Sequence, residues 1–141
     1  MSRSGYSDDA ENVNLWRGAV AAGLRGRRGQ AFLREMLAAL DTMPEKKLIK
    51  DDLEKEGSVC AIGAVGKTRG VDMAGIDPED NDAIARIFGL PFSMACEIMY
   101  LNDEHEIYNP QTRRLVEETD EERFARMRRW VVAHISPDDA S

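Results

Sequence analysis

The chain has 141 residues, which is the size of one domain with a single hydrophobic core. Its apolar share of 43% and its charged share of 32% are typical of a soluble globular protein and exclude a disordered chain. No apolar run is long enough to cross a bilayer, and the polar start MSRSGYSDD has no signal-peptide core, so we expect a cytoplasmic protein without a membrane partner.

The net charge of −7 is unevenly distributed along the chain. Residues 71–122 hold fourteen acids against three arginines, a balance of −11, whereas both ends of the chain are slightly basic. This distribution has two interpretations. The acids can pair with arginines inside the fold, or they can form an acidic face that binds a basic partner.

Apolar residues at steps of three and four predict two helices in the N-terminal part of the chain. The first begins at Asn12, after a polar segment, residues 1–11, that we expect to be flexible. The second runs from Gln30 to about Thr42 and is stopped by Pro44.

The segment LRGRRGQ between these two helices is predicted to be a basic loop. It holds Arg25, Arg27 and Arg28 and is a candidate phosphate-binding patch, although no aromatic residue is interleaved with the arginines. The favoured interpretation is a solvated loop, or a set of ion-pair partners for the acids of residues 71–122.

Two short helices are predicted in the next part of the chain. The first, in EKKLIKDDLEKEG, sets a few apolar residues against many charges and ends at Gly57. The second lies within residues 58–69, whose many small residues suit a helix packed closely on a neighbour; a buried strand is the alternative. The sequence GAVGKT ends like a phosphate-binding loop, but that motif requires a glycine where Ala61 stands.

Two helices in the middle of the chain are predicted to be its packing centre. Asp77 is the expected cap of the first helix and Pro78 is its first residue. Gly89 ends that helix, and Pro91 starts the second. Apolar residues cover most of the circumference of the second helix, which therefore belongs inside a bundle.

The same pair has the apolar skeleton of a helix-turn-helix, with the small residue Ala85 four positions before Gly89. A second helix that reads DNA exposes Arg, Lys, Gln, Asn or Ser. The polar side of this helix instead offers Ser93, Tyr100 and two glutamates, and carboxylates repel phosphates. We therefore expect a structural helix pair, with nucleic-acid recognition as the alternative.

The helix end NDEHE contains residue types that bind metals. It lacks the alternating oxygen ligands and central glycine of a calcium loop, and it lacks the further His or Cys of a zinc site. We therefore predict an exposed acidic helix end, in which Asn102 or Asp103 bonds neighbouring backbone, and no metal site.

Residues 105–117 are predicted to form a minor hairpin or extended loop around an Asn-Pro turn. Its facing apolar residues are Ile107, Tyr108, Leu115 and Val116. The last helix begins with a capping box formed by Thr119 and Glu122, and Arg123 and Arg126 are predicted on its outer side.

Catalytic chemistry has no sequence signature in this chain. There are two histidines, and no Ser/His/Asp or Cys/His spacing suggests a nucleophile with its base. Cys60 and Cys96 lie in apolar helical contexts and are expected to be buried reduced thiols, with a disulfide or a reactive thiol as the alternative. We predict that the protein is not an enzyme and has no catalytic residue, cofactor, metal or small-molecule substrate.

Several segments together resemble a group of uncharacterised small phage and prophage proteins. The segments are RRGQAFLREMLAALDTMPEKKLI, VCAIGAVGKTRGVDM, DPED, ACEIMYLNDE and EETDEERFARMRRWV. Their shared order is an RGQAFL-type helix, a CA-x-GA helix, an ND at a helix end and a terminal RMR-x-W helix. The resemblance covers about residues 24–135, in which HEIYNPQTRRLVE looks like an insertion. It implies a mobile-element context and no particular activity.

We predict a small phage-type binding protein that acts by protein–protein interaction, as an inhibitor of a host antiviral defence component in the manner of an anti-CRISPR protein. Acidic surfaces can imitate nucleic-acid phosphates and occupy a basic groove. The expected partner is a host protein or protein–nucleic-acid complex. The candidate partner-binding residues are Asp103, Glu104, Glu106, Glu117, Glu118 and Glu121.

Two alternatives stay open. The first is a helix-turn-helix-like nucleic-acid-binding regulator that uses basic residues. These residues are Arg25, Arg27, Arg28, Arg113 and Arg114. The second is a virion or assembly protein with a self-association surface, and the sequence leaves the oligomeric state open.

The predicted fold is all-α: a compact bundle of five or six helices with one minor β-hairpin or extended loop near residues 105–117. We expect one domain over residues 1–141, with flexible tails at 1–11 and 136–141. The predicted core residues are Trp16, Val20, Phe32, Leu33, Met36, Leu40, Val59, Ile62, Val65, Ile84, Ile87, Phe88, Phe92, Ala95, Ile98, Met99, Phe124, Met127, Val131 and Ile135.

Overall fold

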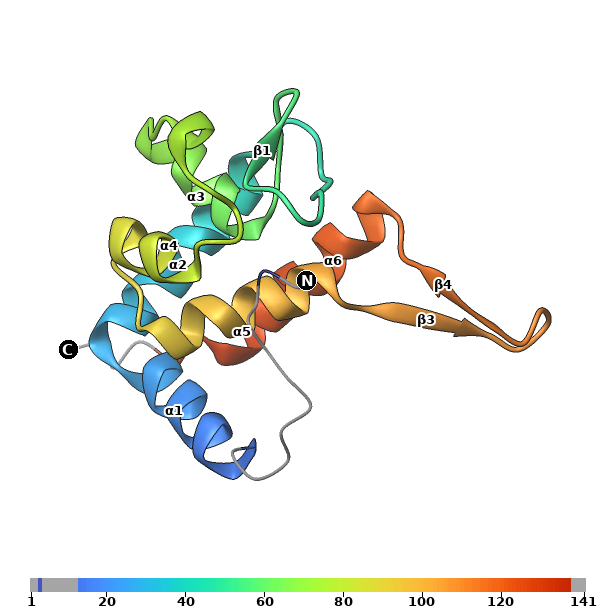
Figure 1. The fold of residues 1–141 in the computed structure, drawn as a ribbon, viewed down its shortest axis with the longest axis horizontal. Coiled ribbons are helices and arrows are strands. Elements are labelled where there is room, and N and C mark those ends of the chain that lie inside the picture. Colours follow the sequence, from blue (N-terminus) through green and yellow to red (C-terminus); the bar gives the residue numbers. More distant parts are fainter. Residues whose placement is uncertain (1–2, 4–12, 138–141) are drawn as a thin grey trace.

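A computed structural model describes residue 3 and residues 13–137 of the chain (Figure 1). Six α-helices dominate this described part, as predicted, and two small antiparallel sheets and one 3-10 helix accompany them. The helices are α1 (Val13–Arg25), α2 (Arg27–Thr42), α3 (Ala61–Arg69), α4 (Asn81–Phe88), α5 (Phe92–Asp103) and α6 (Asp120–His134). The strands are β1 (Glu54–Lys55), β2 (Ser58–Val59), β3 (Glu106–Asn109) and β4 (Arg114–Glu117), and the 3-10 helix is η2 (Met73–Gly75). The predicted flexible tails lie outside the described residues, except for residues 3, 136 and 137.

Helix α5 is the packing centre, as its apolar circumference predicts. It packs against α1, α3, α4 and α6. Its buried residues are Met94, Ala95, Cys96, Ile98, Met99 and Asn102. Three of these, Met94, Ile98 and Met99, are large apolar side chains, and burial of each contributes about 1.5–3 kcal/mol.

The break between α4 and α5 was predicted correctly at Gly89, but the start of α4 was not. Gly89 adopts a left-handed conformation with φ of 73° and caps α4. The N-terminal cap is Asp80, whose side chain accepts a hydrogen bond from the backbone of Ala83. Asp77 instead closes a preceding turn, because its side chain accepts from Glu79 N at 2.9 Å. The helix therefore begins three residues later than the Asp77–Pro78 signal indicates.

The helix predicted for EKKLIKDDLEKEG does not form. Its residues run in an extended path and end in the β1–β2 hairpin. Long-range bonds hold this path, because Leu48 N donates to Asp120 O and Ile49 N donates to Val59 O, at 3.0 and 2.9 Å. Asp51 also has a φ of 70°, which a right-handed helix does not allow. Tertiary bonding thus overrides the local helical pattern.

The helical interpretation of residues 58–69 is confirmed for residues 61–69, which form α3, whereas Ser58–Val59 form strand β2. The Sγ of Cys60 accepts a hydrogen bond from Gly63 N at 3.3 Å and caps the helix. A Cβ at Gly63 would lie 2.0 Å from the backbone oxygen of Leu53, so the helix can pack on this segment only because the residue is glycine. The close packing that small residues predict is therefore present.

The basic segment LRGRRGQ is not a loop. Gly26 alone separates the two helices, so Arg25 ends α1 and Arg27 begins α2. The backbones approach closely, because a Cβ at Gly29 would lie 1.9 Å from the oxygen of Gly23. Because Gly23 and Gly29 allow this close approach, α1 and α2 meet at a sharp corner, and the predicted loop does not form.

The C-terminal elements follow the prediction. Ile107 pairs with Val116 and Tyr108 pairs with Leu115 in the β3–β4 hairpin. The capping box of α6 forms in both directions, between the side chain and backbone of Thr119 and those of Glu122. These elements depend on local signals, which explains why the sequence predicts them well.

Most of the predicted core is buried. The exceptions are Ile87 and Phe92, which are 45% and 42% exposed, and Trp16 and Ile135, which are half-buried. Phe92 lies at the first turn of α5, where its ring meets Trp16 edge-on with centroids 6.2 Å apart. Both cysteines are buried and free, as predicted.

Candidate functional site at the base of the hairpin

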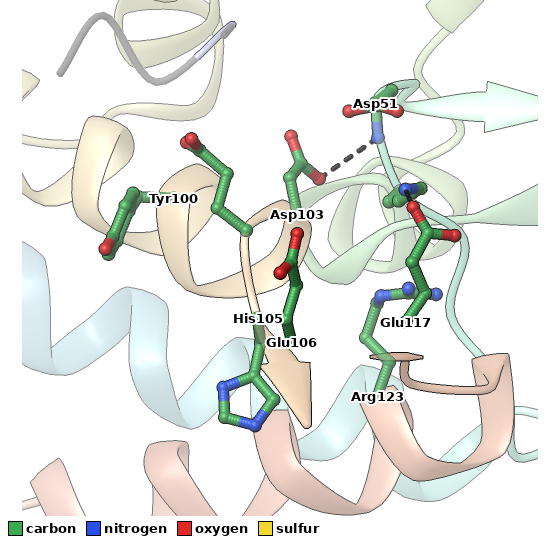
Figure 2. A pocket seen from close by; sticks show the side chains of 9 residues that line it. Asp51, Tyr100, Asp103, His105, Glu106, Glu117 and Arg123 are labelled. Atoms are coloured by element: carbon green, nitrogen blue, oxygen red, sulfur yellow. Dashed lines mark hydrogen bonds and ion pairs between the residues drawn. The ribbon is translucent and has the colours of Figure 1, made fainter. Parts of the chain in front are cut away.

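A cavity of about 470 Å³ opens where the end of α5, the base of the β3–β4 hairpin and residues 48–53 meet (Figure 2). We call it the hairpin-base pocket. It is lined by Lys50, Asp51, Tyr100, Asp103, Glu104, His105, Glu106, Glu117 and Arg123. Five carboxylates against one lysine and one arginine give the lining a net negative formal charge. Four of the predicted partner-binding residues therefore meet in one place, although they come from α5, β3, β4 and the α5–β3 connection.

Asp103 forms the inner wall of the pocket and is not offered to solvent. Its side chain is 4% exposed and accepts two hydrogen bonds from Arg3, one of them 2.9 Å long from Nη2 to Oδ1. It also accepts a bond from Asp51 N at 3.0 Å, which Figure 2 shows as a dashed line. Burial by itself raises the pKa of Asp103, but the bonds and charge of Arg3, together with the hydrogen bonds from Asn102 and Asp51 N, outweigh burial and hold this pKa below its ordinary value.

Asn102, at the end of α5, bonds backbone groups of two other segments through its side chain. Its Oδ1 accepts from Ala61 N at 3.1 Å, and its Nδ2 donates to Ile49 O at 2.9 Å. Its amide also donates to Asp103. The Asn102–Asp103 pair does bond backbone, but the predicted neighbouring partners are wrong, because Ala61 and Ile49 lie 41 and 53 positions away in the sequence. These bonds tie α5 to the start of α3 and to residues 48–53.

Glu118 does not line the pocket and is buried and neutralised within the fold. Its side chain is 2% exposed, and its two oxygens accept from Arg126. Arg123, predicted on the outer side of α6, is also buried, and its Nε lies 3.6 Å from Glu118. Arg123 donates to Leu48 O and Asp120 at 2.8 Å each. Of the predicted acidic surface, Glu118 and Asp103 are therefore internal ion-pair residues.

The exposed members of the acidic set are Glu104, Glu106, Glu117 and Glu121. Glu106 and Glu117 stand directly opposite each other in the hairpin register. Lys50 pairs with Glu117, and this hydrogen bond lowers the pKa of Glu117. Figure 2 shows Glu106 and Glu117 reaching into the pocket from the two strands. Glu121 lies outside the pocket, on the first turn of α6.

The basic residues of the nucleic-acid alternative are not brought together. Arg25, Arg27 and Arg28 lie at the α1–α2 corner, whereas Arg113 and Arg114 lie at the hairpin tip, at the other end of the molecule (Figure 1). Three arginines do share a second cavity, of about 350 Å³, that sequence reasoning missed. They are Arg28, Arg69 and Arg86, from α2, α3 and α4. Their positions are too far apart in sequence for a local basic signal.

The α4–α5 pair turns by 111°, an angle typical of a helix-turn-helix. A DNA-reading helix must leave one whole side open for a groove. Helix α5 instead buries residues around most of its circumference, under α1, α3, α4 and α6. This burial disfavours α5 as a recognition helix.

Cys96 does not offer a nucleophile of low pKa in this fold. Burial, aided by the charge of Asp82, raises the pKa of the Cys96 thiol to about 12. Within residues 3 and 13–137, no three His, Cys, Asp or Glu side chains are arranged to hold a metal ion. No one helix of this part has the length and apolarity to cross a bilayer, and the bent α4–α5 pair reaches that length only when both helices are counted together.

Comparisons of the chain with protein-family models, curated proteins and solved structures found no match. Function is therefore inferred from the side chains and their geometry.

Proposed function

We propose that the protein is a compact helical binding protein that docks its hairpin-base pocket onto a basic surface of another protein. The observation that carries this proposal is the meeting of three exposed glutamates, Glu104, Glu106 and Glu117, around one cavity. Glu106 and Glu117 lie on paired strands at the base of the hairpin, and Glu104 lies on the connection after α5, so the fold brings the three together before a partner arrives. Such preorganisation lowers the entropy cost of binding.

The hairpin register adds an energetic reason for a cationic partner. Like charges directly opposite each other in a sheet are destabilising, and Glu106 and Glu117 are such a pair. Lys50 balances one of them. A guanidinium or ammonium group placed between the two glutamates would relieve the repulsion, and this relief favours complex over free protein.

The biological setting we propose is inhibition of a host antiviral defence component by a phage or prophage protein. The segment resemblance supports that setting, and the exposed glutamates support mimicry of nucleic-acid phosphates. A basic groove that binds nucleic acid is then the surface that the pocket occupies. The proposed partner is a host protein or a host protein–nucleic-acid complex.

Affinity capture from host lysate, followed by mass spectrometry, tests this function with two matched variants. Glu104→Lys with Glu106→Lys reverses the pocket charge, and Glu54→Lys with Glu56→Lys makes the same charge change at the exposed β1–β2 turn. We expect the pocket variant to lose the captured protein and the turn variant to retain it. Binding should also weaken as salt rises. Equal capture by both variants would refute docking through the pocket.

One observation favours a second candidate, a nucleic-acid-binding regulator. The second cavity gathers Arg28, Arg69 and Arg86, and the Arg69 guanidinium lies over the rings of Phe32 and Phe88 at 5.9 and 5.7 Å. Glu35 already occupies Arg69 with a 2.7 Å bond, which reduces the net positive charge there. Micromolar binding of duplex or single-stranded DNA in a polarisation titration at moderate salt would promote this candidate.

A further inference from the structure

The second cavity lies where α2 begins and where α3 and α4 end, at the end of the helical body away from the hairpin (Figure 1). We call it the arginine cavity, after Arg28, Arg69 and Arg86. It shares no lining residue with the hairpin-base pocket. Its lining holds these three arginines against one acid, Glu35, and is therefore positive in a chain whose net charge is −7. This balance favours an anion.

Arg69 forms a fixed wall of the arginine cavity. Its guanidinium donates to both oxygens of Glu35, at 2.7 and 2.5 Å, and to the backbone oxygen of Phe88 at 3.2 Å. It also lies over the rings of Phe32 and Phe88. The carbonyl groups at the end of α4 carry partial negative charge, and the bond to Phe88 offsets it. Arg69 thus balances the two features of the cavity that would repel an anion, which are Glu35 and this helix end.

Arg28 and Arg86 remain available to a ligand. Both are exposed, and neither makes a hydrogen bond or ion pair with any residue that the structure describes. They come from different helices, α2 and α4, and line the same cavity. An arginine binds a phosphate group through two parallel N–H···O bonds, and two arginines match the double charge of a phosphomonoester.

Ile87 adds an apolar wall beside the two free arginines. The sequence places it in the core, but it is 45% exposed and lines the cavity. Inorganic phosphate would leave this apolar surface in water, whereas a ligand with an apolar or aromatic part would cover it. The cavity volume of about 350 Å³ lies near the lower end of the range for small-molecule sites, so the ligand is small.

We propose that the arginine cavity binds a phosphomonoester of about the size of a nucleoside monophosphate. Its phosphate group lies between Arg28 and Arg86, and its ring system packs on Ile87. A hydroxyl group of the ligand can donate to Glu35, whose carboxylate oxygens have lone pairs beyond those that Arg69 uses.

This proposal does not depend on the docking of the hairpin-base pocket. It also differs from the nucleic-acid candidate. Affinity for a nucleic-acid backbone comes from a series of cations along many phosphates, whereas here two free arginines share one small cavity.

Titration with adenosine monophosphate tests the site by NMR on the full chain with labelled isoleucine methyl groups. Ile87 and Ile107 are a matched pair, because both are exposed and only Ile87 lines the arginine cavity. We expect adenosine monophosphate to shift the Ile87 signal and to leave the Ile107 signal unchanged. Adenosine, which has no phosphate group, should shift neither signal, and inorganic phosphate should bind more weakly than adenosine monophosphate.

Two double variants then identify the groups that bind the phosphate. Arg28→Gln with Arg86→Gln removes both free guanidinium groups of the cavity, and Arg17→Gln with Arg129→Gln makes the same charge change at exposed arginines elsewhere. The cavity variant should raise the dissociation constant of adenosine monophosphate about tenfold or more, and the control should stay within about twofold. Because Arg28 and Arg86 are exposed and make no bond to the described residues, the cavity variant should stay folded, which circular dichroism verifies.

Four results would overturn the proposal. The first is an Ile87 signal that does not move at about 10 mM adenosine monophosphate. The second is an equal loss of affinity in the two double variants. The third is binding of adenosine or inorganic phosphate that is as tight as binding of adenosine monophosphate. The fourth is a single-stranded oligonucleotide that binds about tenfold more tightly through Arg28 and Arg86, which would assign the cavity to nucleic acid.

Discussion

Replacement of Asn102 by alanine should test whether the end of α5 is the junction that holds the irregular part of the fold. Asn102 is 1% exposed and is bonded to Ala61 N and Ile49 O, two backbone groups on different elements. Alanine removes both partners at once. A buried polar group that loses its partner costs about 1–3 kcal/mol, so two groups cost about 3 kcal/mol after partial rescue by water.

Urea denaturation measures this loss. With a slope of about 2 kcal/mol per molar urea, a loss of about 3 kcal/mol lowers the midpoint by about 1.5 M. Asn109→Ala is the matched control, because Asn109 bonds only the hairpin turn, at Gln111 N and Thr112 N. Its cost should be about 1 kcal/mol or less. A midpoint for Asn102→Ala that falls no further than that of the control would refute the reasoning.

Three further outcomes follow from the described contacts. Gly63→Ala should destabilise the protein by about 3 kcal/mol or more in thermal or urea unfolding, because its Cβ would lie 2.0 Å from a backbone oxygen. Gly18→Ala, which meets nothing within 4 Å on α1, should instead stabilise it by about 0.5–1 kcal/mol; loss of stability at both positions would contradict the packing argument. Arg3 lowers the pKa of Asp103 in the folded protein. The Arg3–Asp103 pair therefore stabilises the fold fully above the unfolded pKa of 3.8, and this stabilisation is lost as pH falls through the lower folded pKa. From pH 5 to pH 2, the free energy of unfolding should fall less steeply for Asp103→Asn than for the original protein. Equal slopes of unfolding free energy against pH would contradict this prediction. Cys96 is buried and its pKa is raised to about 12, so in the native protein it should resist iodoacetamide at pH 8 and react once urea unfolds the chain. Peptide mass spectrometry measures this labelling, and rapid labelling of the native protein would contradict the burial of Cys96.

Local signals predicted the elements that depend on neighbouring residues. The capping box at Thr119, the left-handed end of α4 at Gly89 and the hairpin pairing of Tyr108 with Leu115 are all decided within a few positions. The path of residues 45–57 could not be predicted in this way. Leu48 there is bonded to Asp120, whose distance in sequence hides the bond from any periodicity.

The candidate site was predicted in its charge but not in its geometry. The acidic segment directed attention to Glu104, Glu106 and Glu117, which do share a pocket. The same signal included Asp103, whose partner Arg3 lies 100 positions away. It also included Glu118, which is buried against Arg126. The amino-acid composition does not distinguish exposed carboxylates from buried ones, and that difference becomes visible only in the structure.

The β3–β4 hairpin has a consequence for how this protein can change over generations. None of the residues 106–117 is buried, so the helical core imposes little constraint on their identity. Substitutions in residues 106–117 can therefore accumulate while the helical scaffold that carries the hairpin stays intact. The outer surface of the hairpin can thus change in shape and charge with little loss of folding stability.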